Sequence, residues 1–421
     1  MDSLWKIAIR NVFRHGRRTA ITCITMMVGI AIFIVYDSLL AGLDRVAIDT
    51  MVHYSASYVK VRTPAYIADE RGTPLDHGIP DSEGAMAAIR KAAPSITAAA
   101  PRTLFIGQAS NYQDAEPVLC AAVDPGLDPK VFDLAANVKQ GNWLPPAGAA
   151  AHDIVISAAL ARDLGLKLGD PLLLSARTVY DNDNADEFTI VGITDMGLTL
   201  EANLYMGYTE ARTFLGEPLP VTEIDTAAPR APNLDAELAA SAKVAAAIGP
   251  ALRGLTAQPV GEFAKDYLAL RNSKSGASFM IILVILLIAA VGIVNTILMS
   301  VYSRVREIGV LRAYGMTAKD IKKLFVREGL ITGLIGSLAG LALGAGLVAW
   351  LDSLRISLGG LVKGNNVDMG GLPVNAVIRL EWRPSTFVVA LVFGLVAAWL
   401  AARSPAKRAA TLEPTDALRF V

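Results

Sequence analysis

The chain has 421 residues, 53% of them apolar, and its 39 basic and 39 acidic side chains give a formal net charge of zero. Its mean hydropathy of +0.43 excludes an ordinary water-soluble protein and indicates a membrane protein. No nucleic-acid partner is expected.

The first 18 residues predict an amphipathic helix that lies on the cytoplasmic membrane surface. Its apolar residues recur at helical spacing opposite a basic face. The apolar set is Leu4, Trp5, Ala8, Ile9, Val12 and Phe13, and the basic set is Lys6, Arg10, Arg14 and Arg17. This helix is either a lever attached to the first span or a simple interfacial anchor.

Four apolar stretches are long enough to cross the hydrocarbon core, which takes about 20 residues. They predict transmembrane helices at 19–43, 278–302, 324–351 and 385–402, and the last is the shortest. The first stretch is longer than the apolar region of a signal peptide, and no A-x-A cleavage site follows it. It is therefore interpreted as a retained signal anchor.

Charge orients these spans. The N-terminal flank has a net charge of +4. The segment from 303 to 328 also has a net charge of +4, and the tail 403–421 has a net charge of +2. The region 44–277 holds 19 basic and 29 acidic residues, a net charge of −10. The positive-inside rule places both termini and segment 303–323 in the cytoplasm. Region 44–277 is then periplasmic, and 352–384 is a short outer loop.

Region 44–277 predicts a folded α+β domain. Strand patterns occur at 57–62, 153–157, 187–194 and 204–208, and helical patterns occur near 82–93 and 234–248. Gly216–Pro232 is rich in Pro and Thr and predicts a boundary between subdomains. The fold class is an α-helical membrane protein with four transmembrane helices and a large α+β extracytoplasmic domain between the first and second spans.

Known catalytic motifs are absent from the sequence, including the Walker phosphate loop, so a non-catalytic subunit without a catalytic residue is expected. The acidic cluster Asp181–Asp186 lacks the glycine and distal glutamate of an EF-hand, and a solvated turn is favoured over a metal site. Cys23 and Cys120 fall on opposite sides of the predicted topology, so no internal disulfide is expected.

Segment 303–323 predicts a short amphipathic coupling helix on the membrane surface. Its apolar residues alternate with basic ones and offer a docking face to a cytoplasmic partner, although a basic loop that only sets topology has a similar composition. In the third span, small residues at three- and four-residue spacing allow close helix packing, and Asn295 in the second span can hydrogen-bond to another helix. These candidates for helix packing or a dimer interface are Asn295, Gly329, Gly333, Gly336, Gly340 and Gly344.

The order N-x-x-x-M-S-V-x-x-R-x-R-E-I-G-V-L-R-A-x-G-M from Asn295 to Met316, followed by E-G-L at 328–330, resembles the FtsX-like permeases. These are the membrane subunits of ABC transporters of the MacB, LolC/LolE and FtsX class. The opening IAIRNVFRHGRRTAIT, the segment VISAALARDLGLKLGDPLLL from Val155 and the tail LEPTDALR at Leu412–Arg419 are similar to the same family.

The resemblance implies a dimer, with a copy or a paralogue as the second permease subunit, driven by two cytoplasmic ABC ATPases. The coupling helix then passes ATPase motion to the spans, while ATP and Mg are bound by the partner and this chain needs no cofactor. The docking residues that it implies are Arg304, Arg306, Glu307, Gly309, Leu311, Arg312, Gly315 and Met316.

A permease with a large outer domain and without an ATPase on the same chain most resembles the lipoprotein-releasing LolC/LolE branch. This implies extraction of lipoproteins or lipids from the outer leaflet of the bacterial inner membrane, with delivery to a periplasmic carrier. The alternatives are MacB-like efflux of small molecules or peptides and an FtsX-like regulator of a periplasmic cell-wall enzyme. A sensor fits four spans poorly.

Overall fold

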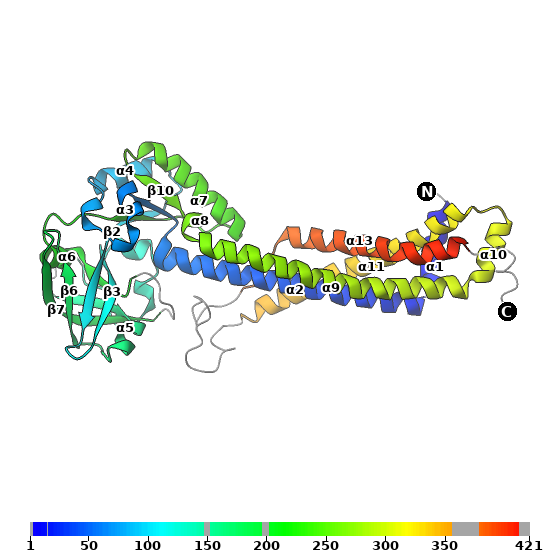
Figure 1. Ribbon diagram of the computed structural model, residues 1–421, viewed down its shortest axis with the longest axis horizontal. Coiled ribbons are helices and arrows are strands. Elements are labelled where there is room, and N and C mark those ends of the chain that lie inside the picture. Colours follow the sequence, from blue (N-terminus) through cyan, green and yellow to red (C-terminus); the bar gives the residue numbers. More distant parts are fainter. Residues whose placement is uncertain (1–2, 15, 147–151, 196–201, 356–378, 412–421) are drawn as a thin grey trace. The chain divides into compact units, whose positions relative to one another are not determined.

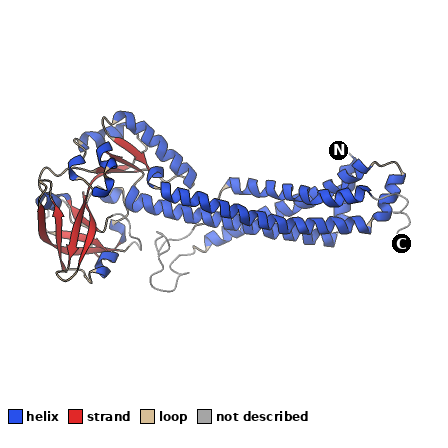
Figure 2. Ribbon diagram, viewed as in Figure 1, coloured by secondary structure: helices blue, strands red, loops and turns tan. Residues whose placement is uncertain are grey.

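The computed structural model describes residues 3–14, 16–146, 152–195, 202–355 and 379–411. The chain divides into two units (Figure 1). The first unit consists of Met1–Leu43, Arg271–Ile356 and Ile378–Val421. The second consists of Asp44–Leu270 and Ser357–Val377. Helices make up the first unit, whereas the strands all lie in the second (Figure 2).

Long helices build the first unit. They are α1 (Ser3–Arg14), α2 (Gly16–Met51), α9 (Lys265–Ser303), α10 (Val305–Ala313), α11 (Ala318–Ser353) and α13 (Pro384–Thr411). Three helical stretches are long and apolar enough to cross a membrane: Thr19–Ala56, Ala318–Ser353 and Pro384–Thr411. The predicted span at 278–302 lies within α9, where the apolar stretch among the described residues is the shorter Ala290–Ser303. Four spans therefore stay a prediction.

Several helix boundaries differ from those predicted. The predicted helix 1–18 ends at Arg14, and α2 begins at Gly16. The coupling helix expected at 303–323 is two elements, because α10 ends at Ala313 and α11 already begins at Ala318. The last helix runs on to Thr411 with Pro405 inside it, so much of the predicted tail 403–421 is helical. Residues 356–378 of the predicted outer loop and the family-like segment at 412–419 lie outside the described residues.

The glycines of α11 lie at helix contacts within the chain. A Cβ added to Gly329 would lie 2.6 Å from the Cβ of Ala402, and Gly333 likewise faces Ala398, both on α13. The other three, Gly336, Gly340 and Gly344, meet residues of α2, namely Met26, Ile30 and Ile34. Small residues thus let α11 approach two neighbouring helices closely.

The second unit is built on a ten-stranded sheet in the order β10-β1-β9-β2-β3-β8-β5-β7-β4, with β6 paired to β2 and β7. The strands are β1 (Val59–Arg62), β2 (Ala98–Ser110), β3 (Ala115–Val123), β4 (Val138–Gly141), β5 (Asp153–Ser157), β6 (Pro171–Arg177), β7 (Asp183–Thr194), β8 (Leu204–Gly207), β9 (Glu223–Ala227) and β10 (Thr256–Pro259). Of the strands predicted from sequence, 153–157 has the observed bounds, whereas 187–194 is longer and begins at Asp183.

Six of these strands close into a ring. β2 pairs with β3 and β6, β7 pairs with β5 and β6, and β8 joins β3 to β5. One face of each strand points into the ring and forms an apolar core that includes Phe105, Cys120, Leu174 and Phe188. This closure removes the exposed edges that an open sheet would leave.

The remaining four strands are β4, which pairs with β7, and β1, β9 and β10, which extend the sheet beyond β2. The shorter helices of this unit are α3 (Pro64–Ala68), α4 (Ser82–Ala92), α5 (Ala158–Asp163), α6 (Tyr208–Leu215), α7 (Leu234–Ile248) and α8 (Val260–Phe263). Helices α5 and α6 pack on the core of the ring. Helices α4 and α7 share a core with β1 and β9. The segment Gly216–Pro232, predicted as a boundary, contains β9, which pairs with β1 and β2. In this segment the chain passes from the core of the ring, which includes Leu215, to the core of β1 and β9, which includes Ile224.

Ionic side chains are buried on one face of β1, β9 and β2. Lys60 Nζ lies 3.0 Å from Glu223 Oε2 and 3.8 Å from Asp225 Oδ1, and these three side chains are at most 1% exposed. Arg102 Nε donates to Asp128 Oδ1 at 2.7 Å. Burial beside Glu223 raises the pKa of Asp225 to about 8, while Lys60 and nearby arginines lower the pKa of Glu223 despite its burial.

Candidate functional site at the elbow of α9, α10 and α11

Helix α10 has an inner and an outer face. Val305, Ile308 and Gly309 recur at three- and four-residue spacing and are buried, with Ile308 in the core shared by α9, α11 and α13. On the other side Arg306 and Val310 are exposed, and Tyr314, which follows the helix, is 88% exposed. A short helix with one buried and one exposed face can transmit force from a partner to the bundle.

Local residues determine where α10 ends and α11 begins. Gly315 has a φ of +94°, a left-handed conformation that a side chain disfavours. The N–H of Met316 donates to the carbonyl of Leu311, which satisfies a carbonyl at the helix end. Thr317 and Asp320 then form a capping box at the start of α11. The elbow is thus a locally specified tight turn.

Five polar side chains meet at this turn, and we call them the elbow cluster: Arg14, Ser300, Arg304, Glu307 and Glu328. Arg304 Nε donates to Glu307 Oε2 at 2.8 Å, and Arg304 Nη1 lies 3.7 Å from Glu328 Oε2. Ser300 Oγ donates to Glu328 Oε1 at 3.2 Å, and Arg14 Nη1 lies 3.6 Å from Glu307 Oε1. The cluster therefore joins α1, α9, α10 and α11 with no net charge.

The contacts of the elbow cluster differ in strength because they differ in burial. The side chains of Arg304 and Glu328 are each 9% exposed, and removing one partner of a buried pair costs about 3–5 kcal/mol. Arg14 and Glu307 are 69% and 47% exposed, and such surface pairs contribute about 1 kcal/mol or less. The inner contacts thus fix α10, whereas the contact with α1 is weak.

Helix α1 packs on the bundle with part of the apolar face predicted for the membrane surface. Ala8 and Val12 are buried, and the guanidinium of Arg327 on α11 lies 5.0 Å from the ring centre of Trp5. Ile9 and Phe13 are exposed, Phe13 by 71%. Exposed apolar residues such as these are available to a lipid surface, and the alternatives of lever and anchor both stay open.

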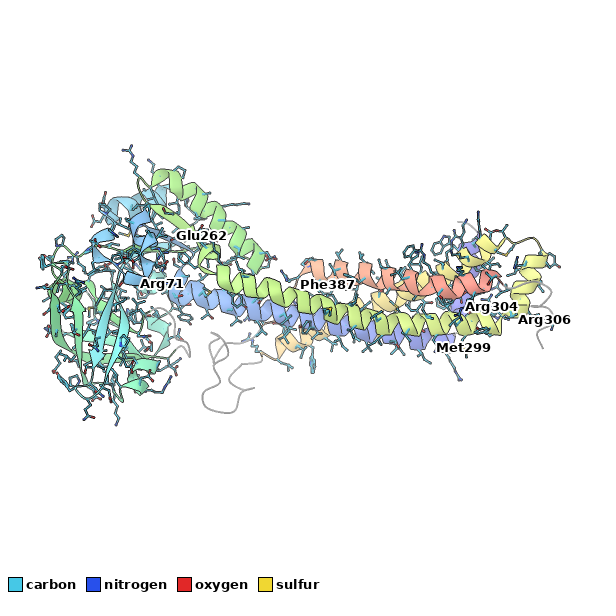
Figure 3. All side chains as sticks on the ribbon, viewed as in Figure 1. Arg71, Glu262, Met299, Arg304, Arg306 and Phe387 are labelled. Carbon is cyan, nitrogen blue, oxygen red and sulfur yellow. The ribbon has the colours of Figure 1, made fainter. Side chains whose placement is uncertain are left out.

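The structure divides the eight predicted docking residues. Arg304 and Gly309 are buried and face the bundle, and the role of all eight residues in ATPase coupling stays a prediction. Arg306, Glu307 and Gly315 are exposed, and Leu311, Arg312 and Met316 are half-buried. Arg304 and Arg306 lie together at one end of the long α9 helix (Figure 3).

Besides Arg14 and Ser300 of the elbow cluster, three further residues outside the predicted set contribute to this site. Val310 and Tyr314 contribute exposed apolar surface, and both belong to the alternating pattern of segment 303–323. Glu328 belongs to the E-G-L motif, but nothing in the sequence pairs it with Arg304. That contact depends on the tight turn, which folds α11 back beside the end of α9.

Asn295 lies on an exposed face of α9, and its side chain makes no hydrogen bond to another helix among the described residues. The neighbouring Thr296 makes such a bond instead, with Thr22 of α2 as its partner. A contact between Asn295 and a second permease subunit stays a prediction.

No three His, Cys, Asp or Glu side chains come close enough to hold a metal ion in the part of the chain that the structure describes. The elbow offers instead a charge-balanced inner face and an exposed apolar and basic outer face. This arrangement suits contact with another protein.

Comparisons with known proteins agree with this arrangement. Residues 19–250 match the MacB-like periplasmic core domain, and residues 279–414 match the FtsX-like permease C-terminal region. The first of these covers more than half of the chain. The two matches together take in both units, including the whole elbow.

Three relatives illustrate the range of similarity. An uncharacterised ABC transporter permease of Methanocaldococcus jannaschii is 36% identical over 32% of this chain and 30% of that protein. The macrolide export ATP-binding/permease protein MacB of Hyphomonas neptunium is 32% identical over 32% of this chain and 17% of that protein. The lipoprotein-releasing system transmembrane protein LolC of Haemophilus influenzae is 26% identical over 63% of this chain and 64% of that protein.

The matched regions thus span less than two thirds of the length of each of these relatives. The family is nevertheless clear from the two domain matches, and the elbow geometry lies inside one of them. The chain belongs to the FtsX-like permeases with a MacB-like periplasmic core domain, and it is an ABC transporter permease of the MacB/LolC type.

Proposed function

We propose that this chain is the non-catalytic membrane subunit of an ABC transporter that extracts lipoproteins or lipids from the outer leaflet of a bacterial inner membrane. A separate cytoplasmic ATPase binds ATP and Mg, and its closure pushes on α10. Both termini and the elbow face the cytoplasm, and the second unit is periplasmic. A second permease subunit, identical or paralogous, completes the complex.

The two-faced α10 carries this proposal. Its outer face, with Arg306, Val310 and Tyr314, is exposed and can receive a partner, while its inner face is buried and tied to the bundle by Arg304. A push on the outer face therefore moves α10 together with the ends of α9 and α11. Tyrosine and arginine are also enriched among the binding hot spots of protein interfaces.

The choice of cargo is supported by the extent of the likeness to LolC, which covers 63% of this chain. Macrolide export is the second candidate, supported by the 32% identity with MacB. The cargo is thus proposed from the likeness to these relatives.

Gentle detergent purification from the native membrane, with mass spectrometry of the bound proteins and lipids, tests this function. An ABC ATPase together with acylated lipoproteins or a periplasmic carrier is the expected result. An ATPase with an outer-membrane channel would favour efflux, and an ATPase with a cell-wall hydrolase would favour a regulator. Recovery without any ATPase would contradict the proposed function.

A further inference from the structure

Glu328 reaches two neighbouring elements with one carboxylate group. Its Oε1 accepts a hydrogen bond from Ser300 Oγ at the end of α9, and its Oε2 lies 3.7 Å from Arg304 Nη1, immediately before α10. The side chain of Glu328 is 9% exposed. We propose that Glu328 is a positioning residue that sets the orientation of α10 on the bundle, and this inference rests on the proposed coupling function.

An apolar residue would fill this position at lower desolvation cost, because burying a carboxylate is unfavourable unless it is paired. On the same helix, Phe325 is buried and Gly329 packs against α13, so this part of α11 faces the bundle. The carboxylate therefore serves to hold Arg304 in place more than to fill space. The guanidinium of Arg304 is stabilised where it lies close to this carboxylate.

Arg304 is shared between two carboxylates of different burial. It makes a close contact of 2.8 Å with Glu307, which is on α10 itself, and a longer contact of 3.7 Å with Glu328, on α11. Arg304 Nη1 and Glu328 Oε2 are both buried and make no hydrogen bond among the described residues. The longer contact is thus an electrostatic attraction that can shorten or lengthen as α10 moves.

Glu307 cannot replace Glu328 in this role. Because Glu307 is on α10, its contact with Arg304 moves with the helix and does not link α10 to another element. Glu307 does reach Arg14 of α1, but that contact is exposed to solvent. Arg304, which immediately precedes α10, and Glu328 on α11 form a buried ionic contact between the two elements.

Spin-label distances on the full chain in lipid nanodiscs test this inference without the ATPase. The two native cysteines are replaced by Cys23→Ala and Cys120→Ala, and labels are placed by Tyr314→Cys and Leu338→Cys. Both label positions are exposed, the first beside α10 and the second on α11. We expect one narrow distance distribution for the otherwise native chain and a distribution at least twice as wide for Glu328→Gln.

Three further variants separate positioning from general damage. Lys322→Gln removes an exposed charge from the same helix and should leave the distribution narrow. Glu328→Asp keeps the charge but withdraws it by one methylene, and should give an intermediate width even if Glu328→Gln folds poorly. Arg304→Gln should broaden the distribution as Glu328→Gln does, and the two changes combined should add little to either.

A narrow distribution in both Glu328→Gln and Arg304→Gln would overturn the inference. So would equal broadening in Lys322→Gln. Because no ATPase is present, these outcomes do not depend on whether the proposed transport function is correct, which the purification experiment tests separately. Where the ATPase is recovered, Glu328→Gln should keep ATP hydrolysis within about twofold and lower release of the copurified cargo at least tenfold.

Discussion

Arg304 Nη1 and Glu328 Oε2 lie 3.7 Å apart in a place where each side chain is only 9% exposed. This contact links the start of α10 to α11 inside the bundle, so that the opposite face of α10 is left for a partner. The buried side of the elbow is therefore held to the bundle, and its exposed side is open to a partner protein.

Replacing Tyr314 with alanine should weaken binding of the ATPase. Tyr314 is 88% exposed, so the change removes contact area without disturbing the core. Loss of one aromatic hot spot should weaken binding roughly tenfold to a hundredfold, with the unfolding temperature unchanged. Titration of the purified ATPase against the chain in nanodiscs measures this. Tyr180→Ala in the second unit, 65% exposed, is the matched control, and equal affinity of both variants would exclude Tyr314 from the interface.

Replacing Glu307 and Arg312 together with alanine should separate ATP hydrolysis from work on the outer side. Glu307 contacts both Arg304 and Arg14, so its loss frees the link between α10 and α1. Reconstituted vesicles should hydrolyse ATP at a rate within a few-fold of the native complex while cargo release falls at least tenfold. Lys319→Ala, an exposed change at the start of α11, should affect neither. Undiminished release by the double variant would remove Glu307 and Arg312 from the coupling path.

Adding a methyl group at Gly333 should destabilise the helical unit. The new Cβ would collide with Ala398 on α13, and overpacking of this kind costs roughly 1–3 kcal/mol. Gly346 on the same helix has open space around it, since no atom falls within 4 Å of an added Cβ. Gly346→Ala should therefore be neutral or slightly stabilising, because alanine favours helix. Thermal unfolding in one detergent compares the two, and equal effects would mean that α11 and α13 are not packed in this way.

Asp225 should make the second unit less stable as the pH rises. Its pKa in the folded chain is raised to about 8, so the folded state keeps a proton that the unfolded state releases near pH 4. Stability then falls as pH increases towards 8, by roughly 2 kcal/mol between pH 6 and pH 8. The asparagine of Asp225→Asn cannot ionise, so this variant should not show the fall in stability between pH 6 and pH 8. Hydrogen exchange of β1 and β9 in the full chain measures this stability as a function of pH. Identical pH profiles for the native chain and Asp225→Asn would contradict the raised pKa of Asp225.

Much of the helical unit could be predicted from the sequence. Apolar length and charge asymmetry located the regions that the structure shows as α2, α11 and α13, and glycine spacing indicated close packing of α11. The ends of these helices were less predictable. Thr317 and Asp320 start α11 earlier than its apolar residues do, and α13 continues through Pro405 into basic residues.

The second unit was harder to predict because its sheet depends on pairings between residues far apart in the sequence. Strand β9 lies in a segment rich in Pro and Thr, yet Thr222 and Thr226 bond to the backbone of Leu104 and Val59 and hold the strand in the centre of the sheet. Lys60 and Arg62 in β1 carry charges that ordinarily face solvent, but both are buried against residues of other elements. Such pairings leave no local pattern in the sequence.

The most direct test of a docking role for α10 is a photo-crosslink from the elbow in the native membrane. Tyr314 is replaced with p-benzoylphenylalanine, the cells are irradiated, and the adducts of the purified chain are identified by mass spectrometry. We expect an adduct with a cytoplasmic ABC ATPase that is absent when the same group replaces Tyr180. Adducts with lipid alone at position 314, or an ATPase adduct only at position 180, would contradict the docking role.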